Sequence, residues 1–161
     1  MHLLIDGYNF IGRQGGLRGD VEAKRERLLS NLARYNQVKT HDIIVVFDGW
    51  KSGHPVEYEE RRGGISVIYS RHGEQADAVI VRMAETMGNA CAVVTSDRAV
   101  QQSVVPFGCV VLFSGEFDIR LRAALSGEFA SIEPPRVRSK SGNPFRRPKV
   151  ERKRQTQLNQ F

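Results

Sequence analysis

The chain has 161 residues, 40% of them apolar, which is enough for one globular domain with a substantial core. It contains no apolar run of 18 or more residues, and the short apolar segment after Met1 has no basic leader, so the sequence predicts a cytoplasmic protein without a membrane span or cleaved signal. The net charge of +6 is compatible with an anionic partner such as a nucleic acid.

Short β-branched runs alternate with longer stretches of helical periodicity through the first 126 residues, which is typical of a parallel α/β sheet. In chain order, the pattern predicts strands at residues 2–5, 42–47, 65–69, 91–95 and 109–113, and helices at about 20–38, 76–87, 97–104 and 116–125. The strands are nearly continuous in Val, Ile, Leu or Phe, as expected when both faces of a sheet are covered. The sequence therefore predicts an α/β fold of three layers, with a central, mainly parallel sheet of about five strands flanked by helices. The connection at residues 49–64 has no clear pattern.

The two cysteines, Cys91 and Cys109, both lie inside apolar runs. A free thiol there acts as a small hydrophobic side chain in a reducing compartment. Structural zinc needs about four ligands at close spacing, and none are present, so neither a disulfide nor a zinc site is expected.

Positive charge is concentrated at the C-terminal end. Residues 134–161 carry nine basic residues against Glu151, a net charge of +8, whereas the remainder has 15 basic and 17 acidic residues, a net charge of −2. Four prolines with neighbouring serines and a glycine disfavour a helix or a core there. We expect a domain over residues 1–130 and a basic, flexible arm over residues 131–161 that tethers RNA or ribosomal RNA, the alternative being a solubilising terminus. The basic residues of this arm are Arg136, Arg138, Lys140, Arg146, Arg147, Lys149, Arg152, Lys153 and Arg154.

Four aspartates follow the carboxyl ends of the predicted strands. Asp6 and Asp48 end the first two strands, Asp77 lies in the first turn of the helix after the third, and Asp97 follows the fourth. If the crossovers are right-handed, all four meet at the sheet edge where ligands bind in open parallel sheets. A single Asp at such a place is commonly a helix cap, but several carboxylates brought together repel one another unless cations neutralise them. Hard oxygen ligands favour Mg²⁺ or Mn²⁺, so the pattern indicates a metal site.

Other catalytic chemistries have little support. The four histidines have no evident partners, and no Gly-x-Ser-x-Gly elbow, phosphate-binding P-loop or dinucleotide fingerprint occurs. A haloacid-dehalogenase-type phosphatase needs a second Asp two residues after Asp6, where this chain has Tyr8. Carboxylate-held cations, by contrast, are sufficient to activate water against a phosphodiester.

Four motifs in order carry a resemblance to a known family. Asp6-Gly7-Tyr8-Asn9, Phe47-Asp48-Gly49, Glu74-Gln75-Ala76-Asp77 and Thr95-Ser96-Asp97 together resemble the NYN domain family of PIN-like nucleases, and within it the YacP-like bacterial branch. The similarity spans about residues 2–126 and leaves the basic arm outside. It implies endoribonuclease activity with Mg²⁺ or Mn²⁺, with metal-binding catalytic acids at Asp6, Asp77 and Asp97. Asp48 is a candidate fourth ligand or outer acid.

Neighbouring polar residues have candidate roles beside these acids, each with a structural alternative. Asn9 is placed to bind a metal-bound water or an acid, and Ser96 to orient Asp97, although both are also common turn or cap residues. Arg13, Arg71 and Arg98 are candidate contacts to the RNA backbone. Glu74 is either another acid of the site or a favourable charge in a first helical turn. Tyr8 and the single tryptophan, Trp50, are either base platforms or packing residues.

Two functions of different classes remain open, and 5′-exonuclease activity or cleavage of DNA is a weaker third option. The first is a metal-dependent endoribonuclease acting on single-stranded RNA, with mRNA or ribosome-associated RNA as candidate substrates. The second is a non-catalytic RNA- or ribosome-binding module that uses the basic arm. The complete set of acids favours the nuclease, because unneutralised like charges would destabilise a fold that had no use for them.

Overall fold

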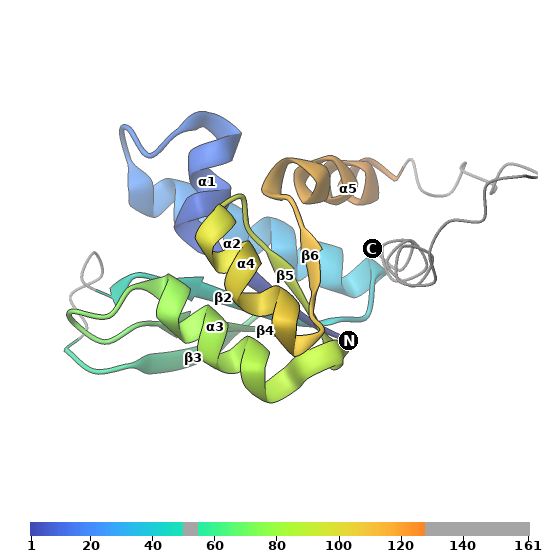
Figure 1. Cartoon of the computed structure of the whole chain (residues 1–161). Coiled ribbons are helices and arrows are strands. Elements are labelled where there is room, and N and C mark those ends of the chain that lie inside the picture. Colours follow the sequence, from blue (N-terminus) through green and yellow to red (C-terminus); the bar gives the residue numbers. More distant parts are fainter. Residues whose placement is uncertain (50–54, 128–161) are drawn as a thin grey trace, which may run out of the picture.

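The computed structural model describes residues 1–49 and 55–127, which form three layers around one mixed sheet (Figure 1). Its strands in this part of the chain are β1 (His2–Asp6), β2 (Asp42–Phe47), β3 (Tyr58–Arg62), β4 (Ile65–Tyr69), β5 (Cys91–Val94) and β6 (Val110–Leu112). Their spatial order is β3-β4-β2-β1-β5-β6. Neighbouring strands are parallel except for β3, which pairs with β4 in the antiparallel sense.

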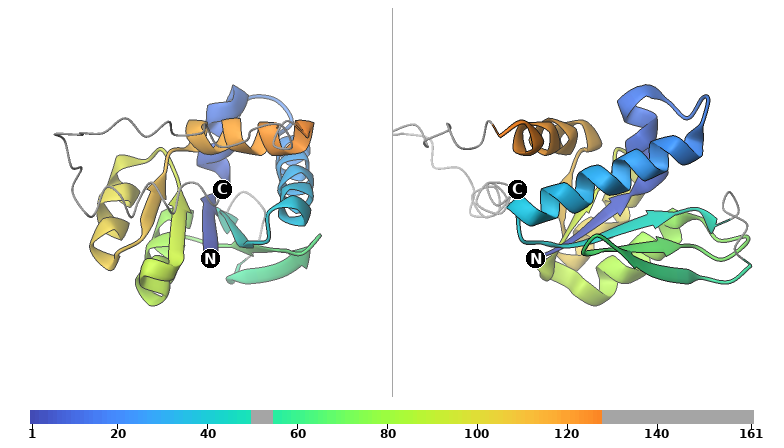
Figure 2. Two further views of the ribbon diagram at one scale, coloured as in Figure 1. Left: turned by 90° about the vertical axis from the view of Figure 1, so that its right-hand side faces the viewer. Right: turned by 180° about the vertical axis from the view of Figure 1, so that it is seen from behind.

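Helices cover both faces of the sheet (Figure 2). The helices are α1 (Gly7–Gly15), α2 (Val21–Val38), α3 (Ala76–Met87), α4 (Arg98–Val104) and α5 (Ser114–Ser126), with short 3₁₀ turns at Gly88–Ala90 and Val105–Phe107. Helices α1, α2 and α5 lie on one face, and α3 and α4 lie on the other. The expected three-layer α/β architecture is therefore confirmed.

Alternate residues of each central strand belong to two separate hydrophobic cores, because successive side chains of a strand point to opposite faces of the sheet. On the α2 side, Phe117 packs edge-to-face against Phe10 and Tyr35, with ring centroids 5.8 and 5.5 Å apart. On the α3 side, Val79 and Ile80 are fully buried in a cluster that includes strand residues such as Leu4 and Val46. Burial on both faces holds the strand ends, and the acids that follow them, in fixed positions.

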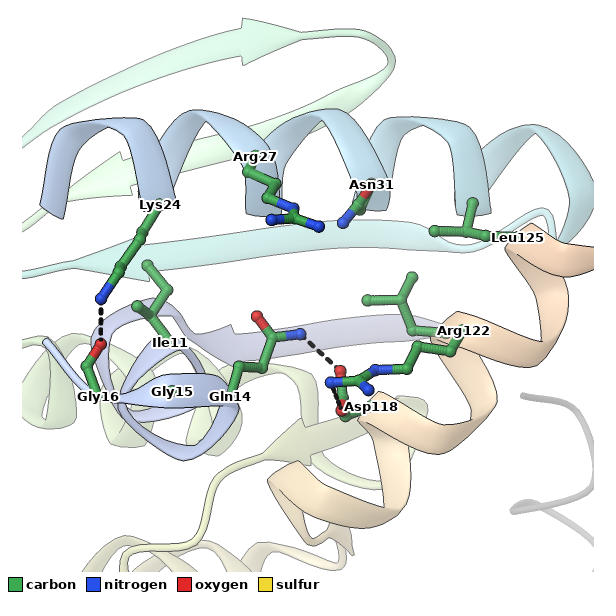
Figure 3. A pocket seen from close by; sticks show the side chains of 11 residues that line it. Ile11, Gln14, Gly15, Gly16, Lys24, Arg27, Asn31, Asp118, Arg122 and Leu125 are labelled. Carbon is green, nitrogen blue, oxygen red and sulfur yellow. Dashed lines mark hydrogen bonds and ion pairs between the residues drawn. The ribbon is translucent and has the colours of Figure 1, made fainter. Parts of the chain in front are cut away.

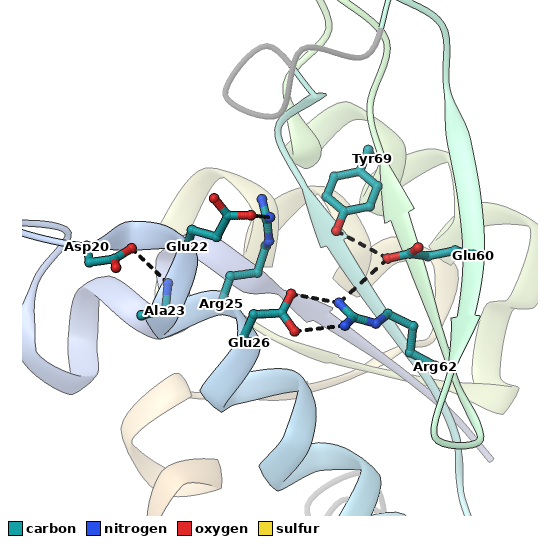
Figure 4. A network of polar contacts seen from close by, with 8 residues as sticks. All are labelled: Asp20, Glu22, Ala23, Arg25, Glu26, Glu60, Arg62 and Tyr69. Carbon is teal, nitrogen blue, oxygen red and sulfur yellow. Dashed lines mark hydrogen bonds and ion pairs between the residues drawn. The ribbon is translucent and has the colours of Figure 1, made fainter.

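The structure adds a sixth strand to the five that were expected. Strand β3 lies inside the connection that had no clear pattern, at the edge of the sheet, and nearly all of its residues are exposed. An exposed edge strand needs no apolar alternation, so its charged sequence gave no strand signal. Its place is held by polar contacts (Figure 4), chiefly the paired contacts of Arg62 with Glu26 of α2 at 2.7 and 2.8 Å.

Helix α1 was also missed by the sequence reasoning. Gly7, Gly12 and Gly15 give it a low intrinsic helix propensity. It forms because the Asp6 side chain accepts a hydrogen bond from the Asn9 amide at its N-terminus and because Phe10 and Ile11 are buried. Tertiary packing therefore overrides propensity over these nine residues.

Several expectations concern residues outside the described ranges. The basic residues of the arm and Trp50 all lie there, and so does the proposed boundary near residue 130. Among the described residues, no helix combines the length and the apolar character that crossing a bilayer requires.

Candidate functional site

The sheet changes the direction of its connections beside β1. Strand β1 leads into α1 and α2 on one face, whereas the neighbouring strand β5 leads into α4 on the other. In open α/β sheets, a crevice forms at the carboxyl ends of the strands where connections diverge in this way. The residues that follow β1 and β5 are those expected to line it.

A cleft of about 520 Å³ lies at this edge. Its lining includes all four predicted acids, Asp6, Asp48, Asp77 and Asp97. They come from four separate strand ends or helix starts, so the topology brings together residues spread over more than ninety positions of sequence. The remaining lining residues are Tyr8, Asn9, Gly12, Arg13, Leu17, Gln75 and Ala76.

Three of these acids also serve as helix caps. Asp6 accepts from the Asn9 amide at 3.1 Å, and Asp97 accepts from the Ala99 amide at 2.7 Å. Asp48 caps α3 from a different strand, because its Oδ1 accepts from the Ala76 amide at 2.7 Å. The N-termini of α1, α3 and α4 thus meet the cleft, and their partial positive charge offsets part of the repulsion between the carboxylates. In each of these three acids the capping hydrogen bond is accepted by Oδ1.

Burial and mutual repulsion make the ionised form of Asp6 costly. Its side chain is buried, and loss of solvation is the largest cause that raises its pKa, from 3.8 to about 7. The hydrogen bond from the Asn9 amide lowers this pKa, and the charges of Asp77, Asp48 and Asp97 raise it further. The pKa of Asp77 is also raised, by burial first and then by Asp97 and Asp48, while a hydrogen bond to Asp6 lowers it. Asp6 and Asp77 thus interact as a pair of carboxyl groups within the cleft.

The donor set fits a divalent cation in part. No three Asp, Glu, His or Cys side chains of the described ranges are close enough to enclose a metal ion as they stand. Mg²⁺ commonly uses only one or two carboxylates and completes its shell with water and phosphate oxygens. Asp6 and Asp77 are such a set, because they interact within the same cleft and a cation can neutralise the two carboxylates in place of protons. Asp48 and Asp97 line the same cleft and are suited to hold the water ligands of that cation.

Asn9 connects three segments that surround the cleft. Its side-chain oxygen accepts from the Ser96 amide at 3.0 Å and from the Ser114 hydroxyl at 3.1 Å. This joins α1 to the loop that carries Asp97 and to the start of α5. Asn9 therefore positions the backbone of the loop before Asp97. The contribution of Ser96 to this contact is its backbone amide, not its hydroxyl.

The glycines that follow two of the acids are required by close packing. A side chain at Gly49 would place its Cβ 1.6 Å from the Ser70 carbonyl oxygen, and the Gly49 amide donates to the Ser70 hydroxyl at 3.0 Å. A Cβ at Gly7 would lie 2.2 Å from the ring of Phe47. The Asp-Gly pairs of the two motifs thus bring the chain close to neighbouring strands directly beside the acids.

The other predicted residues divide between the cleft and its surroundings. Arg13 lines the cleft, and Tyr8 lines it while packing edge-to-face on Phe47 with centroids 5.0 Å apart. Arg71 lies in the adjacent groove between α3 and α4, and Arg98 lines neither this groove nor the cleft.

Glu74 has a structural role. It forms ion pairs with Arg71 at 3.3 Å and with Arg82 at 2.8 Å, and Arg82 is also paired with Glu57. These contacts favour the interpretation of Glu74 as a charge within a surface network rather than as a further acid of the cleft.

Sequence reasoning missed Gln75, Leu17 and Ser114. Gln75 and Leu17 line the cleft, and Ser114 is fully buried against Asn9. A signal existed for Ser114, because a small polar residue directly after an apolar strand marks the same sheet edge as the acids. Leu17 gave none, since its position depends on α1, which was not predicted.

Comparison with known proteins supports the assignment that the motifs suggested. The sequence pattern of the YacP-like NYN domain family matches residues 3–160. The chain is 30% identical to the uncharacterized protein YacP of Bacillus subtilis (strain 168), over 118 residues and 67% of each chain.

Solved structures show the same fold. A crystal structure of Rae1 (YacP) from Bacillus subtilis, of a W164L mutant, matches 80% of this chain and 79% of its own with a TM-score of 0.67 and 25% identity. A second crystal structure of Rae1 (YacP) gives a TM-score of 0.65 at 25% identity, over 81% of this chain and 78% of its own.

The fold is thus that of a PIN-like, nuclease-type α/β domain. The chain belongs to the YacP-like NYN domain family. One expectation is corrected, because the family match continues to residue 160, whereas the resemblance was expected to end near residue 126. The Pro- and Arg-rich segment lacks the apolar periodicity on which the expected limit was based.

Proposed function

We propose that this protein is a metal-dependent endoribonuclease that cuts single-stranded RNA in the acidic cleft, with mRNA or ribosome-associated RNA as its substrate. The observation that carries the proposal is the convergence of four carboxylates on one cleft, with the central residue, Asp6, buried and made costly to ionise. A fold retains such a cluster at the expense of stability when the cluster has a cationic ligand. Family membership agrees with a nuclease-type domain.

Asp6 and Asp77 would hold Mg²⁺ or Mn²⁺ directly, with Asp97 and Asp48 bound to its water ligands. When present, such a cation lowers the pKa of water and stabilises charge on a phosphodiester during in-line displacement. The protein contributes position and electrostatics. Asp6 lies at a buried strand end and Asp77 at a helix start, and Asn9 links the loop of Asp97 to α1 by accepting from the Ser96 amide.

The surroundings of the acids suit a polyanion that approaches the cation. Arg13 is exposed at the rim of the cleft and is available to a phosphate. The N-termini of α1, α3 and α4 direct backbone dipoles toward the same space. No histidine lines the cleft in the described part of the chain, so the side chains there that can exchange a proton near neutral or alkaline pH are the carboxyl groups and Tyr8.

The test is cleavage of an end-labelled, largely single-stranded RNA with Mn²⁺, Mg²⁺ or EDTA, comparing wild type with Asp77→Asn. This substitution keeps the shape of the side chain and removes its charge. Glu59→Gln is the matched control, because Glu59 is exposed on β3, away from the cleft lining. We expect internal cuts that need the metal, disappear in Asp77→Asn and persist in Glu59→Gln.

A wild-type protein that binds RNA but never cuts it, on naked RNA or on translating ribosomes, would contradict the proposal. The same result would favour the alternative of a non-catalytic RNA- or ribosome-binding module that uses the basic C-terminal segment. Cuts that continue unchanged in EDTA would show that the carboxylates act without a metal ion.

A further inference from the structure

A second cavity lies on the other side of α1 from the acidic cleft (Figure 3). Its volume is about 440 Å³, and its walls come from α1, residues 24–31 of α2, and α5. Apolar side chains of Ile11, Leu121 and Leu125 form part of its lining. Figure 3 shows Arg27 and Asn31 of α2 facing Gln14 and Asp118 across this space. The cavity therefore combines apolar surface with groups that bind anions and base edges.

The charges of this cavity favour an anionic ligand. Three cationic side chains line it, Lys24, Arg27 and Arg122, against one carboxylate, Asp118. Asp118 is already engaged, because it accepts from Gln14 at 2.5 Å and pairs with Arg122 at 2.8 Å.

The three cationic side chains differ in the number of contacts that they already make within the protein. Lys24 donates to the carbonyl oxygens of Gly16 and Arg18 at 2.8 and 2.5 Å. Arg27 has no ion pair or hydrogen bond with any residue of the described ranges. A guanidinium that has no partner among the described residues and lies beside a polar cavity is a suitable contact for a phosphate.

Helix α1 joins this cavity to the acidic cleft. Asn9, Gly12 and Arg13 line the cleft, while Ile11 and Gln14 of the same helix line the cavity. The two sites lie on opposite sides of this helix, whose diameter with side chains is about 10–12 Å, so one polymer chain of several nucleotides can reach both. Arg13 lines the cleft and adds a further positive charge on that side of α1.

We propose that the cavity between α1, α2 and α5 binds a nucleotide of the same RNA strand that is cut in the acidic cleft. Arg27, with Arg122, contacts a phosphate, the apolar floor receives a base, and the amides of Gln14 and Asn31 bind base edges. This inference rests on the proposed function. It adds that the RNA substrate extends several nucleotides beyond the cleaved bond, so that it reaches the cavity as well as the cleft.

The experiment measures binding without cleavage. Fluorescence anisotropy is recorded in EDTA with the full chain and a labelled single-stranded RNA of about ten nucleotides, the length range of single-strand sites, and with a labelled trinucleotide. Arg27→Gln is compared with Arg61→Gln, a matched control on β3 outside both cavities. The basic C-terminal segment is present in every variant and contributes equally to each.

Arg27→Gln should weaken binding of the longer RNA roughly fivefold, the size expected for one charged contact open to solvent. It should reduce the slope of the salt dependence by about 0.7, the value for one phosphate contact to a single strand. The trinucleotide is short enough to occupy the cavity alone, so Arg27→Gln should weaken its binding as well, and Arg61→Gln should behave as wild type with both RNAs. Asp118→Asn removes the carboxylate of the cavity and should tighten binding of the longer RNA, which a purely structural role of this residue would not do.

Equal binding of the longer RNA by wild type and Arg27→Gln would overturn the inference, and so would an acidic peptide that competes as well as RNA. Absence of any RNA binding by wild type would overturn it as well. Cleavage with Mn²⁺ is assayed separately on the same variants. If Arg27→Gln weakens RNA binding but wild type does not cleave RNA, the cavity assignment stands and the nuclease proposal is rejected. If wild type cleaves RNA but Arg27→Gln binds RNA as wild type does, the nuclease proposal stands and the cavity assignment is rejected.

Discussion

Replacing Asp6 by Asn should stabilise the metal-free protein. In the folded state the pKa of Asp6 is about 7, against 3.8 for an unperturbed aspartate, because the carboxylate is buried and surrounded by Asp77, Asp48 and Asp97. An acid whose pKa is raised on folding binds protons more tightly in the folded state, so its contribution to stability is present below the unfolded pKa and falls as the pH rises toward 7. Wild type should therefore lose stability between pH 4 and pH 7 and level off above it.

The magnitude follows from the shift of about three pKa units, each worth about 1.4 kcal/mol, which gives a ceiling of about 4 kcal/mol at pH 8. Asn keeps the shape and still caps a helix, so Asp6→Asn removes the charge and retains the contact to the Asn9 amide. Release of repulsion on Asp77 adds to the gain, and incomplete packing subtracts from it. We expect an increase of about 2 to 4 kcal/mol at pH 8, and a much smaller one at pH 4.

The assay is urea unfolding at pH 4, 6 and 8 in EDTA, and again with Mn²⁺. Saturating Mn²⁺ should stabilise wild type by about 3 kcal/mol at a hundredfold excess over its dissociation constant, and should have little effect on Asp6→Asn. Glu59→Gln serves as the control for removing an exposed charge. The reasoning would be refuted if Asp6→Asn were no more stable than wild type at pH 8, or if both proteins had the same pH dependence.

Three further predictions concern the frame of the site. Gly49→Ala should cost about 3 kcal/mol or more in urea unfolding, because its Cβ would meet the Ser70 carbonyl oxygen, and full stability would contradict this packing. Asn9→Ala should cost about 1 to 3 kcal/mol by leaving the Ser96 amide and the Ser114 hydroxyl without their acceptor, and should slow cleavage. Activity equal to wild type would remove Asn9 from the positioning of the Asp97 loop. Phe117→Ala should cost about 3 to 5 kcal/mol, because its ring is fully buried between α5 and α2, and a smaller loss in thermal unfolding would indicate a loosely packed core.

The parts of the fold that were predictable are those governed by burial. Strands such as Asp42–Phe47 are buried on both faces, and their continuous apolar sequence is the direct result. Strand β3 is exposed at the sheet edge and depends on pairs such as Arg62 with Glu26, which are separated by 36 residues. Contacts at that separation leave no local pattern, so this strand could not be read from the sequence.

The same distinction applies to the site. The acids were predictable because topology alone brings strand ends to one edge, and Asp6 and Asp97 both follow central strands. Arg98 is adjacent in sequence but does not line the cleft, because the direction of a side chain on a helix depends on packing that spacing does not reveal. The cavity beside Arg27 depends on how α1, α2 and α5 pack together, and α1 itself was not predicted.

The most direct test of the acidic cleft as a metal centre is to locate the cation. Mn²⁺ is added in small steps to the full, isotope-labelled chain, and the broadening of backbone amide signals is followed by NMR. The account predicts that the first signals to broaden belong to residues next to Asp6, Asp48, Asp77 and Asp97, and that Asp6→Asn needs much more Mn²⁺ for the same effect. Broadening that begins instead around the ion pairs of Glu74, or that is the same in wild type and Asp6→Asn, would contradict it.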